Sequence, residues 1–188
     1  AGIGVAMGNA LPQVRACADM VTDTVENDGI AHALQKLKAC ILKYENEINI
    51  AIRADLGKCA FESYMCETGL VLSELTYMLK HTRKFSKERT VRTPLAQFHS
   101  RSYQKTSPYG VTLIMSPWNY PFMLTIEPLI DALAAGNTAI LKPSAYSAHT
   151  TALISRMIQE CFDEKYVAVV TGGREENNFL LNEHFDYI

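Results

Sequence analysis

The sequence predicts an α/β fold in which a parallel sheet follows two long helices, and a short β/α segment precedes both. Three observations predict it. From residue 111 onward, short apolar runs alternate with longer amphipathic segments, which is typical of βαβ units. Before that, apolar residues recur with helical spacing over two long stretches. The first residues instead form short apolar runs separated by glycine, asparagine and proline.

The first 28 residues predict short elements only. Residues 3–7 are expected to form a strand of small residues, and residues 19–22 a second strand. Between them, Pro12 fits the first turn of a short helix that ends near Ala18. Glycine and asparagine at residues 8–9 tolerate positive φ, which predicts a turn after the first strand.

Two long helices are predicted next, from residue 30 to a stop at Gly57 and over residues 62–85. In both, apolar residues recur at alternating steps of four and three, which places them on one face. We interpret the two faces as packing surfaces. The predicted core positions are Ile30, Leu34, Leu37, Ile41, Tyr44, Ile48 and Ala51 in the first helix and Met65, Thr68, Leu72, Leu75 and Leu79 in the second.

The pattern breaks up between residues 86 and 104, and residues 103–107 predict an extended segment. The α/β alternation then begins. Its predicted strands are residues 111–115, 138–141 and 166–170, its helices are residues 122–135, 148–162 and 175–181, and residues 185–188 resemble the start of another strand.

Composition excludes several classes of function. A net charge of −2 over 188 residues predicts no binding to nucleic acid or to an anionic membrane. The longest uncharged run contains three prolines and is not expected to span a membrane. The five cysteines form no Cys-x-x-Cys, so we expect reduced, mostly buried thiols and a cytoplasmic protein. The five histidines predict no metal site, and no Gly-x-Ser-x-Gly motif of a serine hydrolase occurs.

The most unusual segment runs from Ser116 to Phe122, directly after a predicted strand. Two prolines restrict the backbone around Trp118 and Asn119. An asparagine held there can donate its amide N–H to a carbonyl oxygen where negative charge develops, which is worth about 10²–10³ in rate. The alternative is a capped turn, since asparagine before a helix is a good N-cap. The residues alone favour the cap.

Lys142-Pro143-Ser144 also leaves the end of a predicted strand. A lysine there can reach the hydroxyls or phosphate of a nucleotide, although a solvated surface lysine is the more common explanation of one such residue. Ligands of parallel sheets bind beyond the carboxyl ends of the strands, so the two segments would face one crevice. No Gly-x-Gly-x-x-Gly follows the strand at Val111, and we interpret Gly2, Gly4 and Gly8 as structural.

From about residue 37 to residue 188, the chain resembles the amino-terminal part of the aldehyde dehydrogenase superfamily, most closely the class 3-like, fatty-aldehyde branch. Pro-Trp-Asn-Tyr-Pro followed by Lys-Pro-Ser is its most specific feature. The other segments that carry the resemblance are Ala54-Asp55-Leu56-Gly57-Lys58, residues 93–96, 108–111, 134–138 and 169–173.

The resemblance implies a Rossmann-like domain that binds NAD or NADP, and oxidation of an aldehyde to a carboxylic acid. It implies that Asn119 donates its amide to the substrate oxyanion, which reverses the preference for a cap. It further implies cofactor contacts on the nicotinamide side for Met115, Ser116, Pro117 and Trp118, and at the adenosine ribose for Lys142, with Ser144 in the same loop.

The chain departs from the family pattern in two ways. The family usually has glutamate after Lys-Pro-Ser, where the chain has Ala145, and this puts the preference between NAD and NADP in doubt. The resemblance also covers only the part of the family that precedes its phosphate loop, its general-base glutamate and its nucleophilic cysteine. We therefore expect a truncated domain that is inactive alone, and a homodimer for the full-length enzyme.

Residues 1–31 resemble something else, the carboxyl-terminal end of a Cof-type haloacid dehalogenase-like phosphatase. The resemblance predicts two units, residues 1–31 and residues 32–188, which meet within one helix near residues 30–38. A bifunctional fusion, a recombination event and a joining error all fit, and the last two together are favoured. The alternative functions are a phosphatase remnant in a fusion and a non-catalytic nucleotide-binding fragment.

Overall fold

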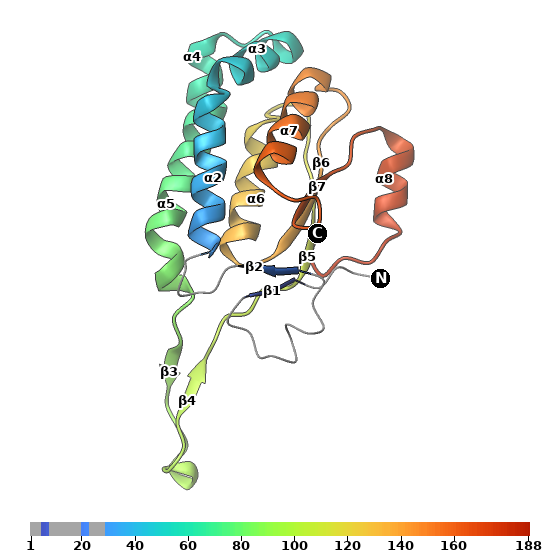
Figure 1. Cartoon of the computed structure of the whole chain (residues 1–188). Helices are drawn as coiled ribbons and strands as arrows, with labels where there is room; N and C mark the ends of the chain where they lie inside the picture. The colour runs from blue at the N-terminus through green and yellow to red at the C-terminus, as the bar shows by residue number, and fades with distance from the viewer. Residues whose placement is uncertain (1–4, 8–19, 23–28) are drawn as a thin grey trace.

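The computed structural model describes residues 5–7, 20–22 and 29–188. Helices form a layer against one face of a parallel sheet (Figure 1). In that view, α2 and α5 lie side by side, α6 and α7 lie between them and the sheet, and α8 lies on the opposite side. A long hairpin, β3–β4, extends away from this body. The predicted α/β fold is confirmed.

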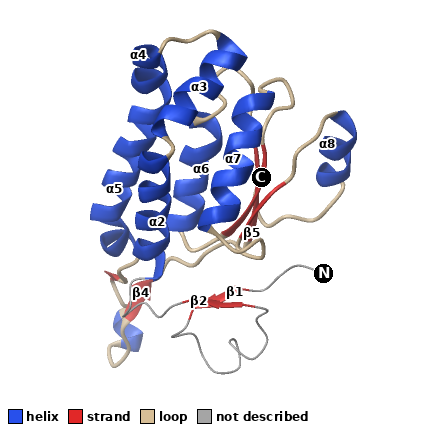
Figure 2. Cartoon of the chain, turned by 45° about the horizontal axis from the view of Figure 1, so that its top comes forward, coloured by secondary structure: helices blue, strands red, loops and turns tan. Residues whose placement is uncertain are grey.

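The sheet consists of β5 (Val111–Met115), β6 (Thr138–Lys142) and β7 (Val167–Val169), paired in parallel in that order. The connections are α6 (Met123–Ala134) and α7 (Ala148–Cys161), which pack on the same face, seen again in Figure 2. Because the strands are parallel, their carboxyl ends meet at one edge. A short segment adds to the other side of β5, where Thr112 and Tyr187 form a bridge.

The first long helix is two helices, α2 (Gly29–Lys43) and α3 (Glu45–Leu56). The prediction of one unbroken helix is wrong at Tyr44, where ψ is 11°. Here the hydroxyl of Tyr44 donates to Glu160 on α7 over 2.7 Å, and α3 turns to pack on α7. Tertiary packing thus ends a helix whose apolar spacing continues. The predicted stop is confirmed, since Gly57 has φ 72° and its N–H donates to the carbonyl of Arg53.

The second long helix contains an irregularity. It begins as α4 (Ala60–Ser63), passes through a π-helical segment, η2 (Tyr64–Thr68), and continues as α5 (Gly69–Phe85). A π turn holds more residues than an α turn and shifts which residues face the core. Glu67 is buried as a result, whereas Met65, a predicted core position, is 54% exposed. The prediction that Met65 is a core position is therefore wrong.

One apolar core joins the helices to the sheet. It takes residues from α2, α3, α5, α6 and α7 and from strands β6 and β7. Half of the predicted core positions are confirmed in it, namely Leu34, Leu37, Ile41, Ile48, Ala51 and Leu75, while Ile30, Tyr44, Leu72 and Leu79 pack at its border. The largest fully buried side chains are Phe122, Leu34, Leu37, Ile41, Ile48, Ile52, Leu75, Leu113, Ile126, Leu129, Ile130 and Leu133.

The remaining elements lie around this body. Strands β3 (Arg89–Val91) and β4 (Ser102–Gln104) pair antiparallel with a 3₁₀ turn, η3 (Leu95–Gln97), between them. The sequence predicted neither β3 nor the pairing. The extended segment predicted at residues 103–107 begins one residue and ends three residues later than β4. Helix α8 (Arg174–Leu181) follows β7 as predicted.

Near the amino end, β1 (Val5–Met7) pairs in parallel with β2 (Met20–Thr22), which confirms strands at both places. The helix and turn predicted between them, and the glycines at 2, 4 and 8, lie outside the described residues. Helix α2 runs unbroken from Gly29 to Lys43, so it spans the predicted seam at residues 30–38. Over the described residues, no helix has the length and apolar character needed to cross a membrane.

Candidate functional site

The two predicted site segments leave the same edge of the sheet. Met115 ends β5 and Lys142 ends β6, and the two residues are directly paired across the strands. The N–H of Ser116 then donates to the carbonyl of Lys142 over 3.2 Å. The structure therefore brings the two segments together, as expected from strands that run parallel.

The bend from Ser116 to Phe122 is closed by hydroxyl groups. The buried Ser116 hydroxyl lies 2.6 Å from that of Thr125, which in turn donates to the carbonyl of Pro121 over 2.6 Å. The side chain of Ser116 thus points toward α6, and its N–H is already used on the carbonyl of Lys142. Pro117 is exposed and Trp118 is 55% exposed.

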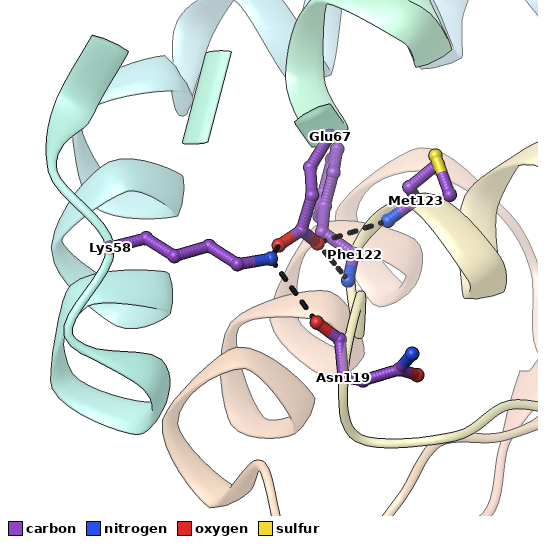
Figure 3. A network of polar contacts seen from close by, with 5 residues as sticks. All are labelled: Lys58, Glu67, Asn119, Phe122 and Met123. Carbon is purple, nitrogen blue, oxygen red and sulfur yellow. Dashed lines mark hydrogen bonds and ion pairs between the residues drawn. The ribbon is translucent and has the colours of Figure 1, made fainter. Parts of the chain in front are cut away.

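Asn119 lies on the exposed part of this bend. Its carbonyl accepts from Lys58, whereas its side-chain amide points away from that contact (Figure 3). The N-cap of α6 is Phe122, with no side-chain cap. The capping interpretation is therefore wrong, because Glu67 takes the first free N–H groups of the helix. Among the described residues, the structure gives the Asn119 amide no hydrogen-bond partner.

Glu67 and Lys58 are site residues that the sequence did not predict. One carboxylate oxygen of Glu67 accepts from the N–H groups of Phe122 at 2.9 Å and Met123 at 3.3 Å. The other accepts from Lys58 at 2.7 Å. A signal existed in hindsight, since Glu67 stands beside a predicted core position and Lys58 ends the Ala-Asp-Leu-Gly-Lys segment.

The same segment supports the second loop. The carboxylate of Asp55 accepts from the N–H of His149 at 3.1 Å and from the N–H of Thr150 at 2.7 Å. These groups belong to the first turn of α7, where free N–H groups attract negative charge. Asp55 thus holds the start of α7, and Lys58, three residues later, contacts the bend before α6 and the carboxylate of Glu67.

Lys142 is 3% exposed, so the interpretation as a solvated surface lysine is wrong. Its ammonium donates to the carbonyls of Gly172 at 2.7 Å and Pro143 at 3.1 Å. Burial lowers the pKa of Lys142 below its ordinary value, and the nearby Glu176 opposes this shift. Glu176 accepts from the N–H of Gly173, and hydrogen bonds from backbone N–H groups lower its own pKa.

Ser144 shapes the turn after Lys142. Its hydroxyl accepts from the N–H of Tyr146 at 3.2 Å, and its carbonyl accepts from the hydroxyl of Thr151 at 2.9 Å. Both Ala145 and Tyr146 are exposed. The loop is thus held by its own residues and by the first turns of α7.

Two other features lie apart from these bends. A shallow groove of about 280 Å³ runs between α3 and α7, and none of the predicted site residues lines it. Within the described ranges, no cluster of three His, Cys, Asp or Glu side chains is arranged to hold a metal ion.

The described cysteines are free thiols. Cys40 and Cys161 are buried as predicted, and burial raises the pKa of Cys161 to about 12. The prediction of burial is wrong for Cys59, which is exposed, and Cys66 is only half-buried. Cys17 lies outside the described residues.

A parallel sheet with two anchored bends at its carboxyl edge defines a Rossmann-like α/β protein. Residues 20–188 match the family model described as the aldehyde dehydrogenase family. The chain therefore belongs to the aldehyde dehydrogenase family. Residues 1–34 match a second model, described as haloacid dehalogenase-like hydrolase, which confirms the other resemblance.

Known relatives agree with this assignment. The 4,4'-diaponeurosporen-aldehyde dehydrogenase of Staphylococcus aureus is 44% identical over 155 residues, which are 82% of this chain and 34% of that protein. Aldehyde dehydrogenase family 3 member A2 of Mus musculus is 37% identical over 155 residues, 82% of this chain and 32% of that protein. The chain spans about a third of the length of these relatives.

A solved structure supports the fold. The substrate-bound state of Staphylococcus aureus AldH matches with a TM-score of 0.82 and 44% identity, over 84% of this chain and 34% of that one. Together with the mouse relative, this confirms the class 3-like branch of the family and the α/β fold.

Proposed function

We propose that the chain forms the amino-terminal part of the cofactor-binding domain of an enzyme that oxidises an aldehyde to a carboxylic acid with NAD or NADP. The observation that carries the proposal is the free side-chain amide of Asn119. It is exposed on a bend whose backbone is anchored on both sides, at the edge of the sheet that Lys142 also borders.

Asn119 is proposed as the oxyanion donor. When a thiolate attacks an aldehyde, the carbonyl oxygen gains negative charge, and a fixed amide N–H stabilises that charge. The side chain must be free to turn its N–H toward the substrate, rather than be fixed by its oxygen, which would accept from helix N–H groups in a cap. Because Glu67 accepts from the first N–H groups of α6, the side chain of Asn119 is not needed to cap that helix.

The residues at the crevice fit a dinucleotide. An ammonium has three donors, and Lys142 uses two on carbonyls, which leaves one for a ribose hydroxyl. Met115 lies beside Lys142, and Pro117 and Trp118 offer exposed surface to a planar ring. Ser116 would contribute through its backbone carbonyl, since its N–H donates to Lys142, and Ser144 would contribute by shaping the loop. When bound, the nicotinamide accepts the hydride that the aldehyde loses.

Two units are proposed, residues 1–31 as a haloacid dehalogenase-like remnant and residues 32–188 as the dehydrogenase part. The match over residues 1–34 supports the first unit, which we propose carries no phosphatase chemistry of its own. We further propose that the 188 residues alone do not produce NADH. A cytoplasmic location and a homodimeric whole enzyme remain predictions.

A chimera tests the proposed function. The segment that aligns with the Staphylococcus aureus relative replaces the equivalent part of that enzyme, and aldehyde-dependent NADH or NADPH formation is measured. The chimera should be active, and Asn119→Ala should lower its kcat by about 10²–10³. An active chimera in which Asn119→Ala keeps the full kcat would reject the role of Asn119.

A further inference from the structure

Glu67 is a fully buried carboxylate in the π-helical segment η2. The π turn requires a glycine at its end. Gly69 approaches the carbonyl of Tyr64 so closely that an added Cβ would lie 2.7 Å from its oxygen. A side chain at residue 69 would therefore push the π turn open. The π turn points Glu67 at the start of α6, where it accepts from Phe122 and Met123 (Figure 3).

Lys58 connects this carboxylate to the bend. Its ammonium lies 2.7 Å from Glu67, donates to the carbonyl of Asn119 over 3.1 Å and sits 4.0 Å from the ring centre of Tyr120. The side chain of Lys58 is 11% exposed and that of Glu67 is fully buried, so the ion pair between them is largely shielded from water. A shielded ammonium interacts strongly with a carboxylate and with an aromatic face.

The two side chains hold both sides of Pro121. Lys58 holds Asn119 and Tyr120 before the proline, and Glu67 holds Phe122 and Met123 after it. Neither side chain touches the amide of Asn119, which leaves that amide free. The arrangement fixes the backbone from which the amide projects.

We propose that Glu67 and Lys58 are a positioning pair that sets the orientation of Asn119. The catalytic meaning of this pair rests on the proposed function of Asn119. Capping α6 alone would need only a neutral acceptor such as serine, threonine or asparagine. An ion pair that reaches from the turn before α4 and from η2, and that is largely buried, is a costly way to cap a helix, because both charges lose their hydration. Its additional effect is the hold of Lys58 on Asn119.

The chain itself provides a local reporter. Trp118 is its only tryptophan and precedes Asn119, so time-resolved fluorescence anisotropy measures motion in the bend. In Lys58→Met, the amplitude of the fast depolarisation should rise about twofold, because side-chain and loop motions on the nanosecond scale are released. The double variant Lys58→Met/Glu67→Gln removes both charges and keeps an amide oxygen for Phe122 and Met123.

The double variant separates positioning from general stability. It should recover most of the free energy of unfolding lost in Lys58→Met, since no buried charge is left unpaired. The raised mobility of Trp118 should nevertheless persist, because the carbonyl of Asn119 still lacks the hydrogen bond from the ammonium of Lys58. The matched control is Lys43→Met, which removes an exposed ion pair of similar length with Glu160 and should leave Trp118 unchanged.

Three results would overturn the positioning pair. The first is an unchanged mobility of Trp118 in Lys58→Met. The second is a double variant in which the mobility of Trp118 returns to its starting value together with the free energy of unfolding. The third is a double variant that does not fold. The last result would assign the pair to general stability.

The chimera adds a catalytic readout. The double variant should lower kcat by about 10- to 100-fold, as expected for a misplaced catalytic group, with the Kd for the cofactor unchanged. A change in Kd with unchanged kcat would contradict positioning of Asn119. The anisotropy uses no activity, so its failure overturns the pair whatever the chimera does. Full kcat in Asn119→Ala overturns the proposed function whatever the anisotropy shows.

Discussion

The bends after β5 and β6 leave the same sheet edge but are held in different ways. The first bend depends on Lys58 and Glu67, which are distant in sequence and carry opposite charges. The second is held by Lys142 on nearby carbonyls and by hydrogen bonds of Ser144 within its own turn. Distant residues anchor both bends, but the first is held by a buried ion pair, whereas the second is held by hydrogen bonds with backbone groups, including those of Asp55 and Gly172.

One short segment links the two arrangements. Asp55 accepts from the first N–H groups of α7, and Lys58 holds the bend before α6. Gly57 lies between the two residues, and its positive φ ends α3 there. Asp55 therefore lies in the last turn of α3, and Lys58 lies in the turn that follows. The anchors of the two bends should therefore differ in strength, and variants can measure the difference.

The largest expected effect belongs to the buried pair. Lys58→Met leaves the fully buried carboxylate of Glu67 without a counter-charge, and breaking such a pair costs about 3–5 kcal/mol of the free energy of unfolding. Urea unfolding of the chain measures it. Lys43→Met serves as the control and should be far less destabilising, because that pair is exposed. Equal losses in the two variants would contradict the comparison.

A smaller effect is expected at the anchor of the second loop. Asp55→Ala leaves the N–H groups of His149 and Thr150 without their acceptor. Loss of a cap costs about 0.5–2 kcal/mol, and the same unfolding measurement detects it. Asp55→Asn keeps one acceptor oxygen, so its free energy of unfolding should lie between those of the parent chain and Asp55→Ala. An Asp55→Ala variant as unstable as Lys58→Met would show that the anchors do not differ.

The smallest effect concerns pH. Because burial lowers the pKa of Lys142 in the folded chain, the unfolded chain binds more protons between the lowered and the ordinary lysine pKa. Through that alkaline window, Lys142 should make the free energy of unfolding rise with pH, relative to Lys142→Met. Unfolding both chains at a series of alkaline pH values measures the difference. The free energy of unfolding of the parent chain minus that of Lys142→Met should increase with pH. A difference that decreases or stays constant would argue against a desolvated ammonium at this position.

The sequence predicted those parts of the fold whose causes are local. The strands β5 to β7 and the helices between them follow from apolar periodicity and from turns at glycine. The break at Tyr44 depends on Glu160, far along the chain, and apolar spacing carries no sign of it. The π turn that buries Glu67 depends on how η2 meets α6, so periodicity placed Met65 in the core instead.

The site was predicted in the same uneven way. The segments at Asn119 and Lys142 were chosen as candidates from their residues, and the structure brings them together at one sheet edge. Their environments were not predicted, because a cap and a solvated lysine are the common fates of such residues taken singly. Asn119 has no capping role because Glu67 accepts from Phe122, and the buried ammonium of Lys142 donates to Gly172. No local pattern connects these partners to the two residues.

The most direct test of the central claim compares the two bends in the active chimera. Rapid kinetics and cofactor titration give kcat and the cofactor Kd for Asn119→Ala and Lys142→Met. Asn119→Ala should lower kcat by about 10²–10³ and leave the Kd unchanged, and Lys142→Met should raise the Kd with little change in kcat at saturating cofactor. If both substitutions raise the Kd and neither lowers kcat, the amide of Asn119 does not act on the reacting oxygen.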